Sequence, residues 1–247
     1  MMVSLMAVNG SYIEWRVRGV ALAQVRAYGE CVLREIMPIF ANLNDKAESV
    51  ATAEYERLGS EPVGDSWDGD MGSLAEAAHD KGLAYYETMT GLRQAVLNLF
   101  AVGLFHLVEQ ELADLCRDAS FDVEPPRDTQ MAVVADWYRD HFGLDLSRLR
   151  TWSTIDELRL VANASKHAEG TAARQLRERR PELFHNPVLR ERFPGAPPSP
   201  WPIFRPLAGE DLYVTPQVLQ QYVEAAVTFA SEVAAHFEQR RDEYYPR

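Results

Sequence analysis

Apolar residues recur at helical spacing along almost the whole chain, and this pattern limits the folds that the chain can adopt. Intervals of three and four residues run through 12–58 and again through 216–240, where they predict a last amphipathic helix. Between these ranges the pattern predicts a long helix over 83–117, a shorter one over 129–142 and another from 153 to about 180. No convincing strand pattern or internal repeat is found. We therefore expect an all-α fold, a helical bundle.

Two segments depart from a plain bundle. The 247 residues suit a single domain over 1–247, with about 1–75 as an N-terminal helical elaboration in which Pro38 kinks or breaks the helix. Residues 181–210 contain eight prolines and predict a long loop inserted before the last helix. Large apolar residues in this loop are expected to anchor it on the bundle: Phe184, Phe193, Trp201, Ile203 and Phe204. Loops of this length in compact domains usually serve function or partner binding.

Charge is distributed unevenly along the chain. The net charge of −12 argues against broad, non-specific binding of nucleic acid. Residues 148–205, however, hold eleven basic and six acidic residues and form the only net-positive segment. Such a segment fits either solvated helix faces or a local anion-binding patch on an acidic body.

Cysteine content and hydropathy predict a cytoplasmic protein. Cys31 and Cys116 lie far apart inside helical patterns, so we expect two packed, reduced thiols. The start of the chain lacks the basic residues of a signal peptide, and no apolar run approaches the roughly 20 residues of a membrane span, so no membrane partner is expected.

No metal or other cofactor is expected either. An acidic loop contains Asp65, Asp68 and Asp70, but Trp67 falls where the EF-hand calcium pattern needs a second ligand. The sequence shows no HExxH, CxxC, phosphate-binding loop or dinucleotide-binding glycine motif.

Four polar side chains share one face of the helix expected near residue 160. A helix turns about 100° per residue, so Arg159, Asn163, Lys166 and His167 fall within an arc of about 100°. Histidine exchanges protons near neutral pH, and lysine and arginine hold phosphate. An asparagine amide adds a neutral donor. This face therefore indicates either a phosphodiester-binding site or a solvated polar surface.

A second polar pair lies in the apolar centre of the long helix. His106 and Glu109 are spaced to contact each other on one face. A histidine satisfied within the core is one interpretation, and a pair supporting the Arg159–His167 face is the other. Ser165 points away from Arg159 and is not expected to act as a nucleophile.

Asn163 and His167, late in a helical chain, resemble the motif of the HEPN superfamily, in which an arginine and a polar residue precede a histidine. Ala162 stands where the arginine is expected, so Arg159 or Lys166 would have to supply the cation. The resemblance implies a homodimer and a metal-independent endoribonuclease of a toxin–antitoxin or antiviral defence system. It also implies partners such as an antitoxin, a nucleotidyltransferase or a defence effector.

Three functional hypotheses follow from these residues. The first is a HEPN-like ribonuclease or toxin, in which His167 moves the proton, Arg159 and Lys166 hold phosphate and Asn163 orients the RNA. The second is a catalytically inactive, dimeric interaction subunit, which Ala162 and the proline-rich loop favour. The third is a bundle that binds a small molecule in a pocket lined by His106 and Glu109.

Overall fold

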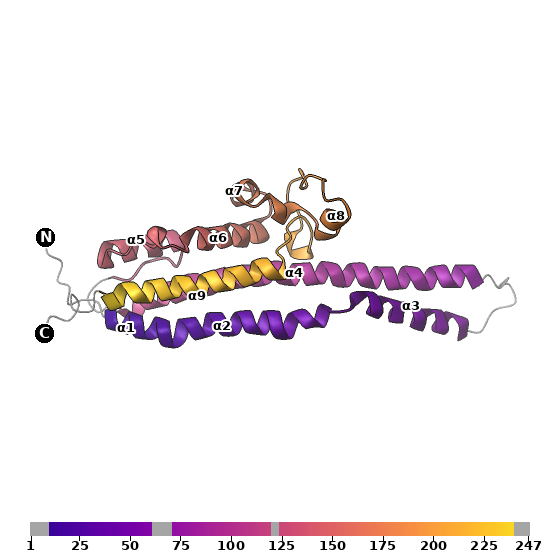
Figure 1. Ribbon diagram of the computed structural model, residues 1–247, viewed down its shortest axis with the longest axis horizontal. Helices are drawn as coiled ribbons and strands as arrows, with labels where there is room; N and C mark the ends of the chain where they lie inside the picture. Colours follow the sequence, from indigo (N-terminus) through magenta and orange to yellow (C-terminus); the bar gives the residue numbers. More distant parts are fainter. Residues whose placement is uncertain (1–9, 61–70, 120–123, 240–247) are drawn as a thin grey trace.

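The 49-residue helix α4 (Met71–Ala119) runs along the length of the molecule (Figure 1). This computed structural model describes residues 10–60, 71–119 and 124–239. Helix α3 (Leu43–Ser60) lies against the N-terminal half of α4, and α9 (Pro216–Gln239) runs along its other half (Figure 1). The described residues contain no strand, which confirms the all-α prediction.

The N-terminal helical stretch breaks where Pro38 was expected to break it. Helices α1 (Gly10–Arg16) and α2 (Leu22–Glu30) continue through wider turns to Ile36 and pack on α9. A short 3₁₀ turn, Met37–Phe40, follows, and Asn42 then adopts the left-handed region at φ 54°. Proline cannot donate the backbone hydrogen bond that would continue the helix. The chain is thereby redirected into α3.

Helices α3 and α4 approach closely because Gly82 has no side chain. A Cβ atom at Gly82 would lie 2.8 Å from the carbonyl oxygen of Ala47 and 2.9 Å from the Cβ of Ala51. Small residues thus set the spacing of this two-helix arm. Helix α4 begins twelve residues before the expected 83, and these residues belong to the arm.

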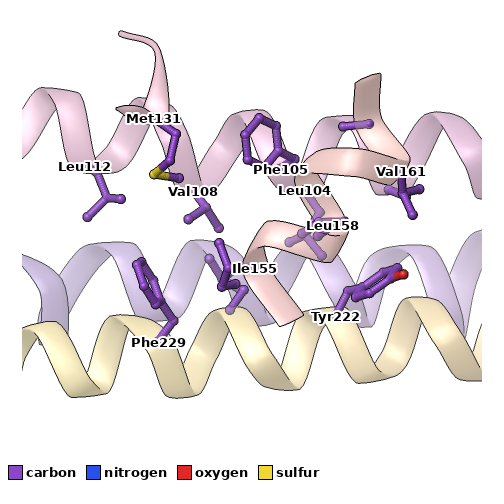
Figure 2. Packing of buried hydrophobic residues seen from close by; sticks show 14 of the residues in the cluster. Leu104, Phe105, Val108, Leu112, Met131, Ile155, Leu158, Val161, Tyr222 and Phe229 are labelled. Carbon is purple, nitrogen blue, oxygen red and sulfur yellow. The ribbon is translucent and has the colours of Figure 1, made fainter. Parts of the chain in front are cut away.

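The main core lies where α6 (Trp152–His167) packs between α4 and α9. Figure 2 shows Ile155 and Leu158 of α6 between these two helices, and both side chains are fully buried. Cys116 of α4 is also buried as expected, but Cys31 is exposed, so the prediction of two packed thiols is half wrong.

Helix α4 is also the one helix in the described part of the chain that is long and apolar enough to cross a membrane by length and composition. Its most apolar 18-residue window is 44% buried by the rest of the protein. The core helix of a soluble protein meets the same criterion, so the expectation of no membrane partner stays a prediction.

Helix α5 (Met131–Phe142) ends at Gly143, which adopts the left-handed conformation that terminates helices, as predicted. Helix α6 ends earlier than expected. It stops at His167, Ala168 has φ 58°, and α7 (Thr171–Arg179) begins a separate helix. Helix α6 also begins one residue before the expected 153, at Trp152, after Thr151, whose hydroxyl donates to Glu232.

Residues 181–210 form the expected loop with short helical turns, including α8 (Pro187–Arg192). Phe184 and Ile203 are buried anchors as predicted. The other three expected anchors, Phe193, Trp201 and Phe204, are instead exposed. Buried Asn98 of α4 ties the end of this segment to the core by donating to the carbonyl oxygens of Pro206 and Leu212.

Candidate functional site

A polar cleft of about 620 Å³ opens between α4, α5 and α6. This volume lies within the range of small-molecule sites. Its lining includes Arg159, Asn163 and Lys166 of α6, together with His106 and Glu109 of α4. The two polar groups singled out in the sequence therefore meet in one place.

His106 lies between Lys166 and Glu109. The Lys166 Nζ is 2.9 Å from His106 Nε2, and His106 Nδ1 is 3.1 Å from Glu109 Oε2. A lysine ammonium donates hydrogen bonds and cannot accept them, so Nε2 is the acceptor and Nδ1 carries the proton that is donated to Glu109. This arrangement directs the acceptor nitrogen of His106 toward Lys166 and its N–H toward Glu109.

The start of α5 holds Glu109 in place. The backbone N–H of Met131, the first residue of α5, donates to Glu109 Oε1 at 2.9 Å. No side chain of α5 itself caps this end, and Glu109 therefore satisfies one of the free N–H groups. The positive end of the helix dipole also attracts the negative side chain.

Arg159 is held by an ion-pair network rather than left free. Its guanidinium contacts Asp156 at 2.7 Å, and Asp156 also binds Arg179 at 2.7 Å. Burial acts to raise the pKa of Asp156, but hydrogen bonds from the two arginines outweigh burial and hold the pKa below its ordinary value. Arg159 thus reaches the cleft with its charge partly balanced.

His167 occupies a different position from the rest of the motif. It is exposed, and it is not among the residues that line the cleft. It is the last residue of α6, directly before the turn at Ala168. The cleft therefore contains a histidine, but that histidine is His106.

Two neighbouring positions of α6 face the core. Ala162 is fully buried, so a long cationic side chain at this position would enter the core instead of the cleft. Ser165 is 1% exposed and its hydroxyl has no hydrogen-bond partner, in agreement with its expected orientation away from Arg159.

Several lining residues were not anticipated from the sequence. Arg139 lines the cleft and pairs with Asp136 at 2.8 Å, an interaction that raises the pKa of the arginine. Asp145 contributes a further carboxylate, and the Trp152 side chain an apolar surface. No motif distinguishes these residues from ordinary surface charges. The ionised side chains of the lining are three cations and four carboxylates.

Within the described residues, no group of three histidine, cysteine or acidic side chains is placed to hold a metal ion. Asp65, Asp68 and Asp70 of the acidic loop lie outside those residues. Comparison of the chain with protein-family models, curated proteins and solved structures gives no match.

Proposed function

We propose that the cleft is the active site of a metal-independent endoribonuclease in which His106, not His167, accepts the proton. The observation that carries this proposal is the Glu109–His106–Lys166 arrangement on the wall of an open cleft. A carboxylate that orients a histidine recurs in general-base catalysis, and here the Lys166 ammonium occupies the nitrogen that would accept the proton.

The reaction begins when a ribose 2′-hydroxyl replaces the Lys166 ammonium at His106 Nε2. His106 takes the hydroxyl proton, the 2′ oxygen forms a bond to phosphorus, and the bond from phosphorus to the 5′ oxygen breaks. The 5′ oxygen leaves with a proton from water. The products are a 2′,3′-cyclic phosphate and a 5′-hydroxyl end, and Glu109 stabilises the imidazolium that forms.

Lys166 has the second role in this proposal. Once displaced from His106, its ammonium is free to hold the phosphate oxygens, whose negative charge increases in the transition state. Arg159 and Asn163 line the same wall and contribute further hydrogen-bond donors. Assembly as a homodimer, with an antitoxin, nucleotidyltransferase or defence effector as partner, remains part of the proposal through the HEPN resemblance.

A catalytically inactive interaction subunit is the second candidate. The balance of charges in the cleft favours it, because Asp136 and Asp156 already pair with Arg139 and Arg159. An anion entering the cleft would have to compete with these carboxylates.

Incubation of the purified protein with single-stranded RNA in EDTA tests the enzyme proposal. We expect cleavage that leaves 2′,3′-cyclic phosphate ends, and Lys166→Gln should cleave at least tenfold more slowly. An absence of cleavage in EDTA across neutral pH would favour the interaction subunit. Cleavage that leaves 3′-hydroxyl ends would contradict the proposed use of the 2′-hydroxyl.

A further inference from the structure

A second cavity lies where α4, α8 and the start of α9 meet, and residues of the proline-rich segment line part of it. Its volume is about 490 Å³, within the range of small-molecule sites. It shares no lining residue with the cleft that contains His106. Any ligand of this cavity is therefore independent of the proposed nuclease chemistry.

The cavity contains a polar group that the protein leaves unsatisfied. The hydroxyl oxygen of Thr90, a lining residue on α4, is buried and has no hydrogen-bond partner. Buried hydroxyls in folded proteins are nearly always bonded, so an orphaned one calls for an explanation. A rotation of the Thr90 side chain about its Cα–Cβ bond would present the hydroxyl to the cavity, where a polar atom of a ligand would supply the missing partner.

Two arginines line the same cavity from different elements. Arg93 belongs to α4 and Arg190 to α8, and neither forms an ion pair within 4 Å in the described part of the chain. Glu87 is the one carboxylate among the lining residues. In a chain of net charge −12, this is a locally positive cavity, and arginine is the side chain best suited to bind phosphate with two parallel hydrogen bonds.

Aromatic rings complete the lining. Tyr86 of α4 and Tyr213, just before α9, both line the cavity and are partly buried. Tyrosine rings pack well against flat ligands because their faces are electron-rich. The cavity thus combines groups suited to a phosphate with groups suited to a planar ring.

Hydrogen bonds between the elements hold these walls in position. The Gln94 side chain donates to the Val214 carbonyl oxygen at 2.9 Å, and the backbone N–H of Tyr213 donates to the Leu183 carbonyl oxygen at 2.7 Å. Asn186 caps the start of α8 by accepting from the N–H groups of Val188 and Leu189. When the walls of a site are already held in place, binding costs little conformational entropy, and the affinity is higher.

We propose that the cavity between α4, α8 and α9 binds a phosphorylated small molecule that carries a planar ring, of the mononucleotide class. Arg93 and Arg190 hold the phosphate, Tyr86 and Tyr213 pack on the ring, and Thr90 bonds a polar atom of the ligand. Because this site shares no lining residue with the nuclease cleft, His106→Gln should leave binding here unchanged.

Isothermal titration calorimetry with AMP as the probe tests this proposal. We expect AMP to bind, with adenosine and inorganic phosphate each at least tenfold weaker. Arg93→Gln and Arg190→Gln should each weaken AMP binding about tenfold or more, because each removes a charge-assisted contact. Arg127→Gln, an exposed arginine elsewhere, should leave binding unchanged.

Thr90→Val provides a variant of nearly the same shape, and circular dichroism checks that each variant is folded. Loss of AMP affinity in folded Thr90→Val would support the role of the buried hydroxyl. The proposal is overturned if AMP does not bind, if adenosine binds as tightly as AMP, or if the folded arginine variants bind AMP as well as Arg127→Gln does.

Discussion

Lys166 Nζ lies 2.9 Å from His106 Nε2, although sixty residues separate the two positions in the chain. This contact joins α6 to the C-terminal half of α4 and brings the polar face of one helix to the polar pair of the other. It also identifies the histidine that a ligand in the cleft would meet. In the proposed mechanism, the α6 face acts together with a residue of α4.

In the proposed mechanism Glu109 positions His106. Glu109→Gln removes the negative charge of this side chain and keeps nearly the same shape. Glutamine can still accept from the N–H of Met131, but it no longer stabilises a protonated His106. We expect kcat for RNA cleavage to fall at least tenfold with little change in KM, because the imidazolium formed on His106 in the transition state loses its negative partner. An unchanged kcat would remove Glu109 from the mechanism.

Asn98 should be one of the most sensitive positions for stability. Its side chain donates to two carbonyl oxygens and accepts from the N–H of Val214 at 3.2 Å, and it is fully buried. Asn98→Ala leaves these backbone groups without partners, so the free energy of unfolding should fall by about 2–4 kcal/mol. Urea denaturation measures this change. Asn163→Ala, in the open cleft, serves as the control and should change stability by less than about 1 kcal/mol.

Asp156 should contribute to the loss of stability at low pH. Its pKa is lower in the folded protein because Arg159 and Arg179 bind the carboxylate, despite the opposing effect of burial. A depressed folded pKa stabilises the protein above the unfolded pKa of about 3.9, and this contribution is lost as the pH falls through the folded pKa.

Asp156→Asn should therefore lower the free energy of unfolding at pH 7 and flatten its decline below about pH 5. Urea denaturation over this pH range gives both quantities. Exposed Asp80→Asn is the control and should follow the wild type. If the free energy of unfolding falls equally with decreasing pH in wild type and Asp156→Asn, the ion pairs with Asp156 do not stabilise the fold.

The two cysteines should differ sharply in reactivity. Burial raises the pKa of Cys116 to about 12, with a smaller opposing effect of the Tyr138 hydrogen bond, whereas Cys31 is exposed. At pH 8 a thiol reagent should label one cysteine rapidly, and Cys31→Ser should abolish this fast phase. Rapid labelling of two thiols in the native protein would mean that Cys116 is accessible.

Local signals made much of the fold predictable. The end of α5 at Gly143 and the break near Pro38 follow from the backbone preferences of single residues, and the structure has both. The end of α6 was missed because it depends on distant contacts: Glu169 accepts from the backbone N–H of Ile203, which lies in the proline-rich segment. Helical periodicity alone does not reveal such a contact.

The site was predictable to a similar extent. The angular spacing of Arg159, Asn163 and Lys166 places them on one wall, because that relation is internal to a helix. The partnership of Lys166 with His106 could not be read from the sequence, since it arises from the packing of α6 against α4. His167 was favoured because it shares the helix face and matches the histidine position of the HEPN motif, although it does not line the cleft.

RNA cleavage in EDTA by His106→Gln and His167→Gln, compared with the wild type, tests the central claim most directly. We predict that His106→Gln loses about 100-fold or more in rate, as expected when a general base is removed, while His167→Gln stays within about threefold of the wild type. Circular dichroism verifies that both variants are folded. The reverse pattern, with activity lost in His167→Gln and kept in His106→Gln, would contradict the assignment of His106 as the proton acceptor.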